Sequence, residues 1–407
     1  MSPYSRRHAL RGGLVTATAC LAGCVFSRDE DGEENERGRT LHESDVTLSS
    51  TASWPSYRRD ARNTGYDSDV SGPRDDATVA WRYSARTEAE SGVVVDGGRV
   101  YAGGSILDGE TGQRIGGEWG GHTTTPTVAD GTLFVPTFDL EGRDPATGEL
   151  DWTFEPDSQA GGLGGVTVAD GTAYVLGKLG KRGRPPIYAV DGTSGEEEWR
   201  WTPDGDEIGS VRSPLAVADD TVYLLDENGI VCAIDRETGD EKWRRPTFVR
   251  TSSSPVVVDG TVYFGSEDSE ATALRAEDGE PRWRTRLAHE SEETVAVTSE
   301  SVFATGGENV TRLSTADGTI EWERQFDDVG QLGSPTVAGD TVYVGSRSDG
   351  TVLALAAGDG TENWRVETRS VSFGDYTRSG VVDGPAVVDG VVYVATEPGD
   401  VYAIAEL

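Results

Sequence analysis

Apolar and polar positions alternate along most of the chain in short runs, and one arrangement of four runs keeps returning. In its clearest copy, apolar runs cover 254–258, 261–264 and 271–274, and a fourth run contains Trp283. Such alternation predicts β-strands, and Asp259-Gly260 between the first two runs suits a two-residue hairpin turn. The corresponding turn pairs are Asp96-Gly97, Asp130-Gly131, Asp170-Gly171, Asp219-Asp220, Asp259-Gly260, Ser299-Glu300, Gly339-Asp340 and Asp389-Gly390. Most lie about 40 residues apart, a period that predicts a β-propeller.

A tryptophan follows a turn glycine by four residues in most copies of the unit, on the strand expected to be outermost. These tryptophans are Trp152, Trp199, Trp243, Trp283, Trp322 and Trp364. Placement once per unit favours packing between neighbouring blades over stacking on a ligand. In the first unit Gly112 leads instead to Gly116, and Trp119 is a candidate for the missing role.

The count of strands predicts how the ring closes. Eight sets of three strands follow residue 90, but only seven fourth strands follow them, because the chain ends at Leu407. Residues 78–83, with Trp81, match the missing fourth strand and precede the first set. We therefore predict an all-β, eight-bladed propeller of four-stranded antiparallel blades, in which this N-terminal strand completes the last blade and leaves no open edge.

The formal charge is −35, and only three lysines are present, Lys178, Lys181 and Lys242. An acidic, lysine-poor surface at this level favours a salt-adapted protein over an ordinary acidic one. It also argues against nucleic acid as a partner, because nucleic-acid binding requires a basic surface. Cys232 is predicted to be a small buried residue in a strand rather than a nucleophile.

The N-terminus is predicted to be an export signal. Arg6 and Arg7 precede a short apolar stretch, and Leu-Ala-Gly comes directly before Cys24. The first feature resembles a twin-arginine signal, although Ala9 stands where a bulkier apolar residue is usual, and the second resembles a lipobox. We expect residues 1–23 to be a signal peptide, 24–53 an acidic disordered tether attached through lipidated Cys24, and 54–407 the propeller. The predicted location is the outer face of the cytoplasmic membrane.

Residues 144–152 and 234–243 resemble the repeat of the PQQ-like β-propeller family, and residues 54–60 and 63–66 resemble its lead-in segment. That family includes quinoprotein alcohol dehydrogenases and the BamB lipoprotein. For a dehydrogenase, the resemblance implies Ca²⁺ held by Asp, Glu and Asn, a catalytic Asp, and a disulfide of adjacent cysteines against the quinone. Adjacent cysteines are absent. The turn aspartate of the repeat is also lost in later copies, at Arg275, Ser314 and Ala356.

No catalytic or metal-ligating residues are assigned, and no cofactor is predicted; PQQ and Ca²⁺ belong to the dehydrogenase alternative. Acidic residues are too numerous to single out a pair, and His42, His122 and His289 are scattered along the sequence. His122 precedes an expected inner strand and could face the channel, but a plain polar lining residue is the favoured interpretation.

Two insertions interrupt the regular spacing of the repeat. One, at 178–186, lies between the second and third strands of the third blade and is basic; the other, at 372–378, lies between the last two blades. Both kinds of loop emerge on the same face of a propeller. Insertions in loops are tolerated freely, so solvated hairpins are one interpretation and a docking face for an acidic protein or polysaccharide is the other. The candidate binding residues are Lys178, Lys181, Arg182, Arg184, Phe373, Tyr376 and Arg378.

Together these features predict a membrane-anchored extracytoplasmic propeller that serves as a protein-binding or assembly scaffold. The alternatives are a PQQ-dependent dehydrogenase and a sensor that binds a small ligand in the central channel.

Overall fold

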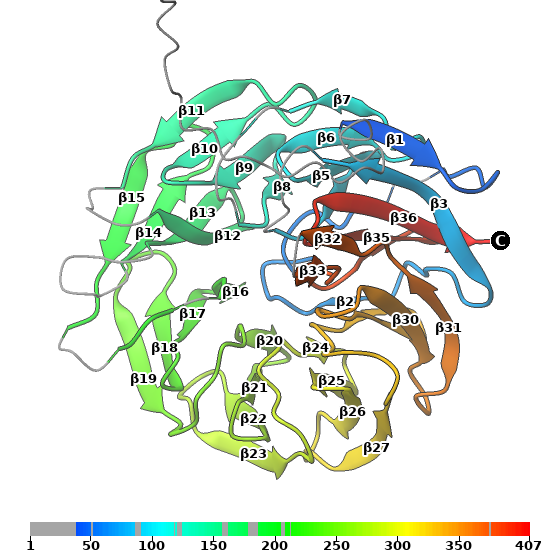
Figure 1. Ribbon diagram of the computed structural model, residues 1–407. Helices are drawn as coiled ribbons and strands as arrows, with labels where there is room; N and C mark the ends of the chain where they lie inside the picture. Colours follow the sequence, from blue (N-terminus) through cyan, green and yellow to red (C-terminus); the bar gives the residue numbers. More distant parts are fainter. Residues whose placement is uncertain are drawn as a thin grey trace, which may run out of the picture. The chain divides into compact units, whose positions relative to one another are not determined.

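The computed structural model describes residues 38–49, 52–85, 91–117, 119, 124–156, 162–177, 186–204, 208–211, 213–373 and 376–407. The chain divides into two units, Met1–Asn35 and Glu36–Leu407, and the described residues all belong to the second. Within the second unit, eight antiparallel sheets are arranged as blades around a central axis (Figure 1). The predicted fold class is therefore confirmed.

Each blade runs from an inner strand A to an outer strand D. Blade 1 comprises β4 (Val94–Asp96), β5 (Arg99–Ala102), β6 (Ser105–Asp108) and β7 (Arg114–Gly116). Blade 2 comprises β8 (Thr127–Ala129), β9 (Thr132–Pro136), β10 (Leu140–Arg143) and β11 (Leu150–Phe154). Blade 3 comprises β12 (Leu163–Ala169), β13 (Thr172–Gly177), β14 (Ile187–Asp191) and β15 (Glu197–Trp201). Blade 4 comprises β16 (Ala216–Ala218), β17 (Thr221–Leu225), β18 (Ile230–Asp235) and β19 (Glu241–Pro246). Blade 5 comprises β20 (Val256–Val258), β21 (Thr261–Ser266), β22 (Glu270–Arg275) and β23 (Pro281–Arg286).

Blade 6 comprises β24 (Ala296–Val297), β25 (Ser301–Gly306), β26 (Asn309–Ser314) and β27 (Ile320–Gln325). Blade 7 comprises β28 (Thr336–Ala338), β29 (Thr341–Gly345), β30 (Thr351–Ala356) and β31 (Glu362–Glu367), with β2 (Tyr66–Asp67) added in parallel inside β28. Blade 8 comprises β34 (Ala386–Val388), β35 (Val391–Ala395), β36 (Asp400–Glu406) and β3 (Ala77–Ser84), with β1 (Arg39–His42) outside β3.

The A–B turns are largely those that the sequence predicts. At Asp259 and Gly260 the φ angles are +46° and +66°, the left-handed conformation that a type I′ turn requires at both positions. In blade 1 the pairing of Asp96 with Arg99 moves the turn by one residue, to Gly97-Gly98, so Asp96-Gly97 was wrong by one position. Two glycines replace Asp-Gly there because neither carries a Cβ that opposes positive φ.

The ring closes as predicted, through pairing of the two ends of the propeller. Strand β3 is antiparallel to β36, with Trp81 opposite Ala403 and Ala77 opposite Glu406. Residues 39–42, which the sequence analysis placed in the tether, instead form β1 and pair with 81–84 of β3. This extra strand covers the outer edge of blade 8, an edge that would otherwise expose unpaired backbone groups.

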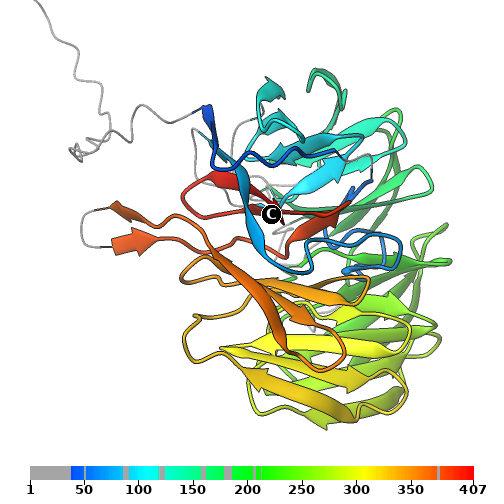
Figure 2. The ribbon, with the colours of Figure 1, turned by 90° about the vertical axis from the view of Figure 1, so that its right-hand side faces the viewer.

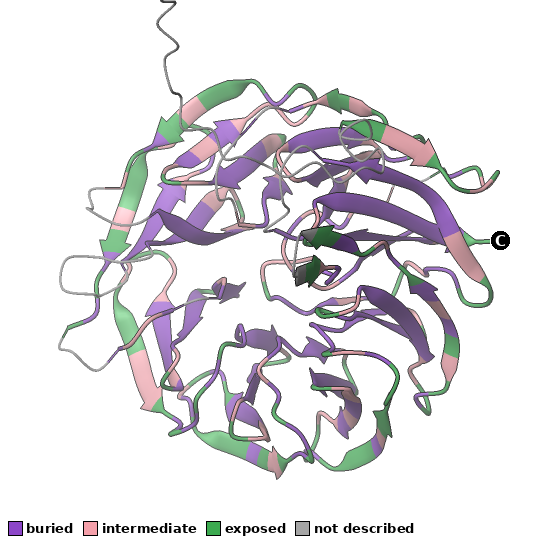
Figure 3. Ribbon diagram, in the orientation of Figure 1, coloured by how far each residue is buried: buried purple, intermediate pink, exposed green. Residues whose placement is uncertain are grey.

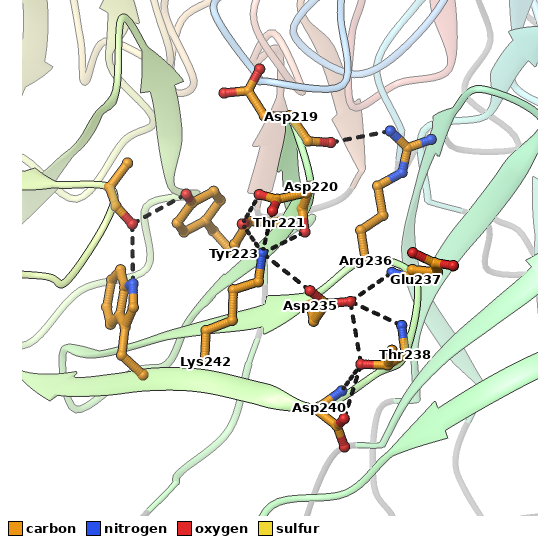
Figure 4. Close-up of polar contacts among 12 residues, drawn as sticks. Asp219, Asp220, Thr221, Tyr223, Asp235, Arg236, Glu237, Thr238, Asp240 and Lys242 are labelled. Atoms are coloured by element: carbon orange, nitrogen blue, oxygen red, sulfur yellow. Dashed lines mark hydrogen bonds and ion pairs between the residues drawn. The ribbon is translucent and has the colours of Figure 1, made fainter.

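Every D-strand tryptophan lies at a seam between blades. In blade 4, Trp243 Nε1 donates a hydrogen bond to the Ala276 carbonyl of the next blade at 3.0 Å, and Tyr223 Oη donates to the same oxygen at 3.3 Å (Figure 4). The turn glycine of the next blade packs under the indole: a Cβ on Gly279 would lie 2.7 Å from Trp243. The seven tryptophans at the repeated position also pack against an aromatic ring on strand B of their own blade, in the pairs Trp81–Tyr393, Trp152–Phe134, Trp199–Tyr174, Trp243–Tyr223, Trp283–Tyr263, Trp322–Phe303 and Trp364–Tyr343. The core therefore lies between blades, and outward-facing positions of the D strands are exposed (Figure 3).

The turn aspartate acts as expected. Asp235 accepts hydrogen bonds from the backbone N–H groups of Glu237 and Thr238, both at 3.0 Å, and these bonds hold the pKa of its carboxyl below the ordinary value. Lys242 forms ion pairs with Asp235 and Asp220 beside this turn (Figure 4). In the later copies of the repeat, which lack this turn aspartate, an aspartate at another position of the same turn caps it. Asp278, Asp317 and Asp359, each directly before the turn glycine, accept from a backbone N–H group instead.

The lead-in segment runs along the inner edges of the blades. Trp54 pairs with Val95 of blade 1, and carbonyls of later residues accept hydrogen bonds from the inner strands of successive blades. These bonds are Val128 N to Pro55 O, Val217 N to Ala61 O, Val257 N to Arg62 O, Val297 N to Thr64 O and Val337 N to Gly65 O. Unpaired N–H groups of strand A that would face the axis are thus satisfied by the segment.

Candidate functional site

Some predicted site residues lie outside the described residues. These are Arg6, Arg7, Cys24, Lys178, Lys181, Arg182 and Arg184, together with His122. The second insertion is described in part: β32 (Val371–Phe373) and β33 (Tyr376–Arg378) form a two-stranded arm that belongs to no blade. Figure 2 shows this arm, in orange, extending away from the ring. For Phe373 and Tyr376 the structure describes the backbone course only.

The base of the arm is fixed by a buried carboxylate. Asp400 has no solvent exposure and forms ion pairs with Arg369, at 3.0 Å, and Arg82, at 3.3 Å. The backbone N–H of Arg369 also donates to Tyr402 Oη at 3.0 Å. Two arginines around one enclosed carboxylate form charge-assisted hydrogen bonds, which hold the root of the arm to blade 8.

The same face carries an exposed phenylalanine in the loop between blades 4 and 5. Phe248 is 87% exposed and has a φ of +65°, which is unfavourable for a residue with a Cβ. Its neighbours hold it there: Thr247 and Val249 are buried, and the Thr247 hydroxyl donates to the Gly229 carbonyl at 2.6 Å. At the corresponding position of the next loop, after strand D of blade 5, stands Ala288. The aromatic ring is therefore a local exception to the repeat.

A second exposed phenylalanine lies in a B–C turn on this face. Phe138 is 67% exposed between β9 and β10 of blade 2. The matching turns of blades 4 and 5 carry Asn228 and Asp268, which are polar. Exposed aromatic rings at loop tips are typical of binding surfaces, since they lose apolar hydration on contact without ordering many rotamers. Neither phenylalanine was among the predicted site residues, although both differ from the residues at the same place in other copies of the repeat.

A surface pocket of about 540 Å³ adjoins Phe248. Its lining is mostly charged: Glu267, Asp268, Glu270, Glu290, Arg284 and Arg286, with Thr247, Phe248, Val249 and Ser269. This pocket combines one exposed ring with charges of both signs, which suits recognition of a polypeptide or a sugar polymer more than of a small apolar ligand.

Polar groups gather around the axis where the D–A loops meet the lead-in segment. Arg58 is 3% exposed, has a φ of +53°, and donates from Nη2 to the Val295 carbonyl at 3.2 Å. Tyr57 Oη lies 2.9 Å from Thr294 Oγ1, and desolvation raises the pKa of Tyr57 to about 12. Desolvation also raises the pKa of Asp383, which accepts from Thr125 at 3.3 Å. Tyr57 and Asp383 are half-buried, whereas Arg58 between them in this polar cluster is buried.

Within the described ranges, no group of three or more His, Cys, Asp and Glu side chains is placed to hold a metal ion. His289, one of the scattered histidines, is buried and bonds to Thr311 Oγ1 at 2.9 Å. Cys232 is buried in β18 as expected, and burial raises the pKa of its thiol to about 12. The described ranges also contain no helix of the length and apolarity needed to cross a membrane.

Comparison with known proteins identifies the family. The family model described as outer membrane protein assembly factor BamB matches residues 136–304 and 282–406. The chain belongs to this family of PQQ-like propellers.

Solved structures share the fold at low sequence identity. A quinohemoprotein alcohol dehydrogenase from Comamonas testosteroni superposes with a TM-score of 0.71 at 16% identity, covering 88% of this chain and 81% of that chain. BamB from Moraxella catarrhalis gives 0.52 at 18% identity, covering 69% of this chain and 95% of that one. These likenesses show the fold alone.

Curated relatives match a third of the chain. The serine/threonine-protein kinase AfsK of Streptomyces griseus is 32% identical over 140 residues, which are 32% of this chain and 16% of the kinase. The dehydrogenase subunit of the quinone alcohol dehydrogenase of Acetobacter aceti is 30% identical over 157 residues, 33% of this chain and 21% of that subunit. The chain thus spans about a fifth of the length of these relatives.

Proposed function

We propose that this propeller is a docking scaffold that binds a partner protein or surface polymer through the face formed by its B–C and D–A loops. One observation carries the proposal: Phe138 and Phe248 are 67% and 87% exposed on this face, where neighbouring copies of the repeat place polar or small residues. The arm β32–β33 extends from the same face, and the basic insertion 178–186 belongs to a loop of the same kind.

The charges of this face favour an acidic partner. Lys178, Lys181, Arg182 and Arg184 are concentrated in one loop of a chain whose formal charge is −35. A basic segment on an acidic molecule would attract an acidic partner and orient it, while the exposed rings would provide apolar contact. Phe373, Tyr376 and Arg378 of the arm belong to the same proposed surface.

We place this scaffold outside the cell, anchored to the membrane through lipidated Cys24 after export directed by Arg6 and Arg7. The acidic composition supports a salt-adapted host, because carboxylates keep a surface hydrated when salt screens their repulsion. Labelling cells with a radioactive fatty-acid or glycerol precursor tests the anchor. Cys24→Ala should abolish incorporation of the label into the protein. Incorporation that persists in this variant would show that Cys24 is not the lipidated residue.

The quinone-dependent dehydrogenase is the alternative, supported by the shared fold. One feature weighs against it: the sequence lacks the adjacent cysteines that the resemblance implies. The discriminating measurement adds PQQ and Ca²⁺ to the purified chain. The scaffold predicts no saturable uptake and no quinone absorbance on the protein, whereas stoichiometric uptake would favour the dehydrogenase.

The scaffold is tested with paired substitutions at exposed sites. Phe138→Ser and Phe248→Ser together should remove the partner captured by crosslinking on intact cells, and the melting temperature should stay within a degree or two, since both rings are exposed. Leu150→Ser is the matched control, because Leu150 is 52% exposed but lies on outer strand β11. Loss of the partner in the control as well, or its retention in the double variant, would count against the loop face.

A further inference from the structure

The pocket beside Phe248 contains an arginine that lacks the partner its counterparts have. In blades 3, 4 and 7, the arginine that directly follows the D-strand tryptophan forms an ion pair with a glutamate three residues before it. These pairs are Arg200–Glu197 at 2.8 Å, Arg244–Glu241 at 2.6 Å and Arg365–Glu362 at 2.6 Å. In blade 5 the arginine is Arg284, and Pro281 stands in place of the glutamate. Because a proline side chain accepts no hydrogen bond, blade 5 lacks this ion pair.

No other group replaces the missing glutamate. The side chain of Arg284 is exposed, lines the pocket, and makes no hydrogen bond or ion pair with any residue that the structure describes. Arg286 lines the same wall, at a position of the repeat where no other blade has a basic residue. Two guanidinium groups thus lie together on a chain whose formal charge is −35, and the one on Arg284 is available for charge-assisted hydrogen bonds to a ligand.

The backbone around Phe248 is fixed on both sides of the ring. Both the N–H and the hydroxyl of Thr247 donate to the Gly229 carbonyl of blade 4, at 2.9 and 2.6 Å. Two residues after the ring, the N–H of Arg250 donates to the Asp268 carboxylate of blade 5 at 2.7 Å. Little backbone freedom is therefore lost when a ligand contacts the ring of Phe248.

The pocket also offers acceptors for hydroxyl groups. The carboxylates of Glu270 and Glu290 line it, and neither forms a hydrogen bond or an ion pair within the described part of the chain. An acidic peptide would satisfy the arginine but brings few hydroxyl donors to these carboxylates, and a neutral sugar brings hydroxyl donors but no anion for the arginine. A hexuronic acid carries a carboxylate, several hydroxyl groups and a ring face of C–H groups.

We propose that this pocket binds a hexuronic acid unit of an acidic glycan carried by the scaffold's partner. The sugar carboxylate accepts hydrogen bonds from Arg284, and the sugar hydroxyl groups donate to Glu270 and Glu290. The C–H face of the sugar ring lies on Phe248, whose π face is electron-rich. This assignment rests on the loop-face scaffold proposed above and specifies the ligand at one site of that face.

The test uses the methyl glycosides of glucuronic, galacturonic and mannuronic acid as probes and saturation-transfer-difference NMR of the full chain as the readout. We expect at least one probe to bind saturably, in the millimolar range of a single sugar in an open pocket. The neutral methyl glycoside of the same sugar should bind at least tenfold more weakly, and N-acetylglutamate amide should not displace the probe. Equal binding of the neutral sugar, equal displacement by the amide, or no saturable binding of any probe would refute the proposal.

Substitutions locate the site. Arg284→Gln and Phe248→Ser should each weaken binding at least tenfold, and Pro281→Glu should weaken it while keeping Arg284, because the glutamate restores the ion pair of the other blades. Arg282→Gln is the matched control and should leave binding unchanged, since it removes the same charge from an exposed residue of β23 that does not line the pocket. Unchanged binding in folded Arg284→Gln, or an equal loss in Arg282→Gln, would overturn the assignment.

Crosslinking on intact cells separates this proposal from the scaffold itself. A partner captured at position 248 without uronate binding to the purified chain would retain the loop-face scaffold and refute the sugar ligand. Uronate binding that depends on Arg284, without any captured partner, would support the sugar site and count against the scaffold.

Discussion

Ring closure by β3 can be tested at Trp81. Its side chain has no solvent exposure, packs on Tyr393 at a centroid distance of 5.8 Å, and donates to Gly109 at 3.0 Å. Burial of roughly 200 Å² at about 25 cal/mol per Å² corresponds to about 5 kcal/mol, and Trp→Ala substitutions in cores typically cost about 3–5 kcal/mol. The Gly109 carbonyl keeps its bond from Tyr393, so no buried acceptor is orphaned. We expect Trp81→Ala to lower the free energy of unfolding by about 4 kcal/mol.

The assay is urea unfolding at constant high salt, followed by far-ultraviolet circular dichroism. Trp243→Ala is the internal comparison, because Trp243 is only partly buried at a seam between consecutive blades. It should cost about 3 kcal/mol, less than Trp81→Ala. Trp81→Phe, which removes the N–H donor and keeps a ring, should cost about 1–2 kcal/mol. A loss below about 1 kcal/mol for Trp81→Ala would mean that β3 does not complete blade 8, and the closure would be refuted.

Two further predictions concern the turns of the repeat. Gly131 and Gly239 have φ of +80° and +75°, but a Cβ meets nothing within 4 Å at Gly131 and lies 2.8 Å from Trp199 at Gly239. Thermal unfolding should therefore show a loss of about 1 kcal/mol for Gly131→Ala and about 3 kcal/mol for Gly239→Ala, and equal losses would contradict the packing of indole on glycine. Asp235→Ala should lower the melting temperature at neutral pH. Since the folded-state pKa of Asp235 lies below 3.8, its stabilisation is complete above that pH and fades as the pH falls through the lowered value. The melting temperatures of wild type and variant should converge only in that acidic range, and a difference that persists there would contradict the capping role.

The fold could be predicted from the sequence because its signals are local and repeated. Period-two alternation, Asp-Gly turns and one missing fourth strand were enough to predict eight blades and closure through 78–83. The path of the lead-in segment could not be predicted in the same way. Its contacts with the inner strands are made by backbone carbonyls, such as those of Ala61 and Arg62, which leave no side-chain pattern in the sequence.

The exposed surface was less predictable than the ring. Strand β1 has no alternating apolar pattern, since its pairing with β3 lies at a largely exposed edge. Phe248 was not predicted as a site residue, because a single apolar residue in a loop is ordinary. It stands out only when it is compared with Ala288 at the corresponding position of the next blade. The loss of the D-strand tryptophan at Gly116 could be recognised from the copies, and Trp119, the predicted substitute, is buried between blades 1 and 2 in one cluster with Ile106.

The most direct test of the scaffold is site-specific photocrosslinking on intact cells. A photoreactive phenylalanine analogue is placed at position 248 on the loop face or, as the control, at position 150 on an outer strand. We predict a discrete crosslinked product at 248 that is identified by mass spectrometry and competes with unmodified protein, and no such product at 150. The same products at both positions, or none at 248 with the protein folded and present at the cell surface, would contradict docking through this face.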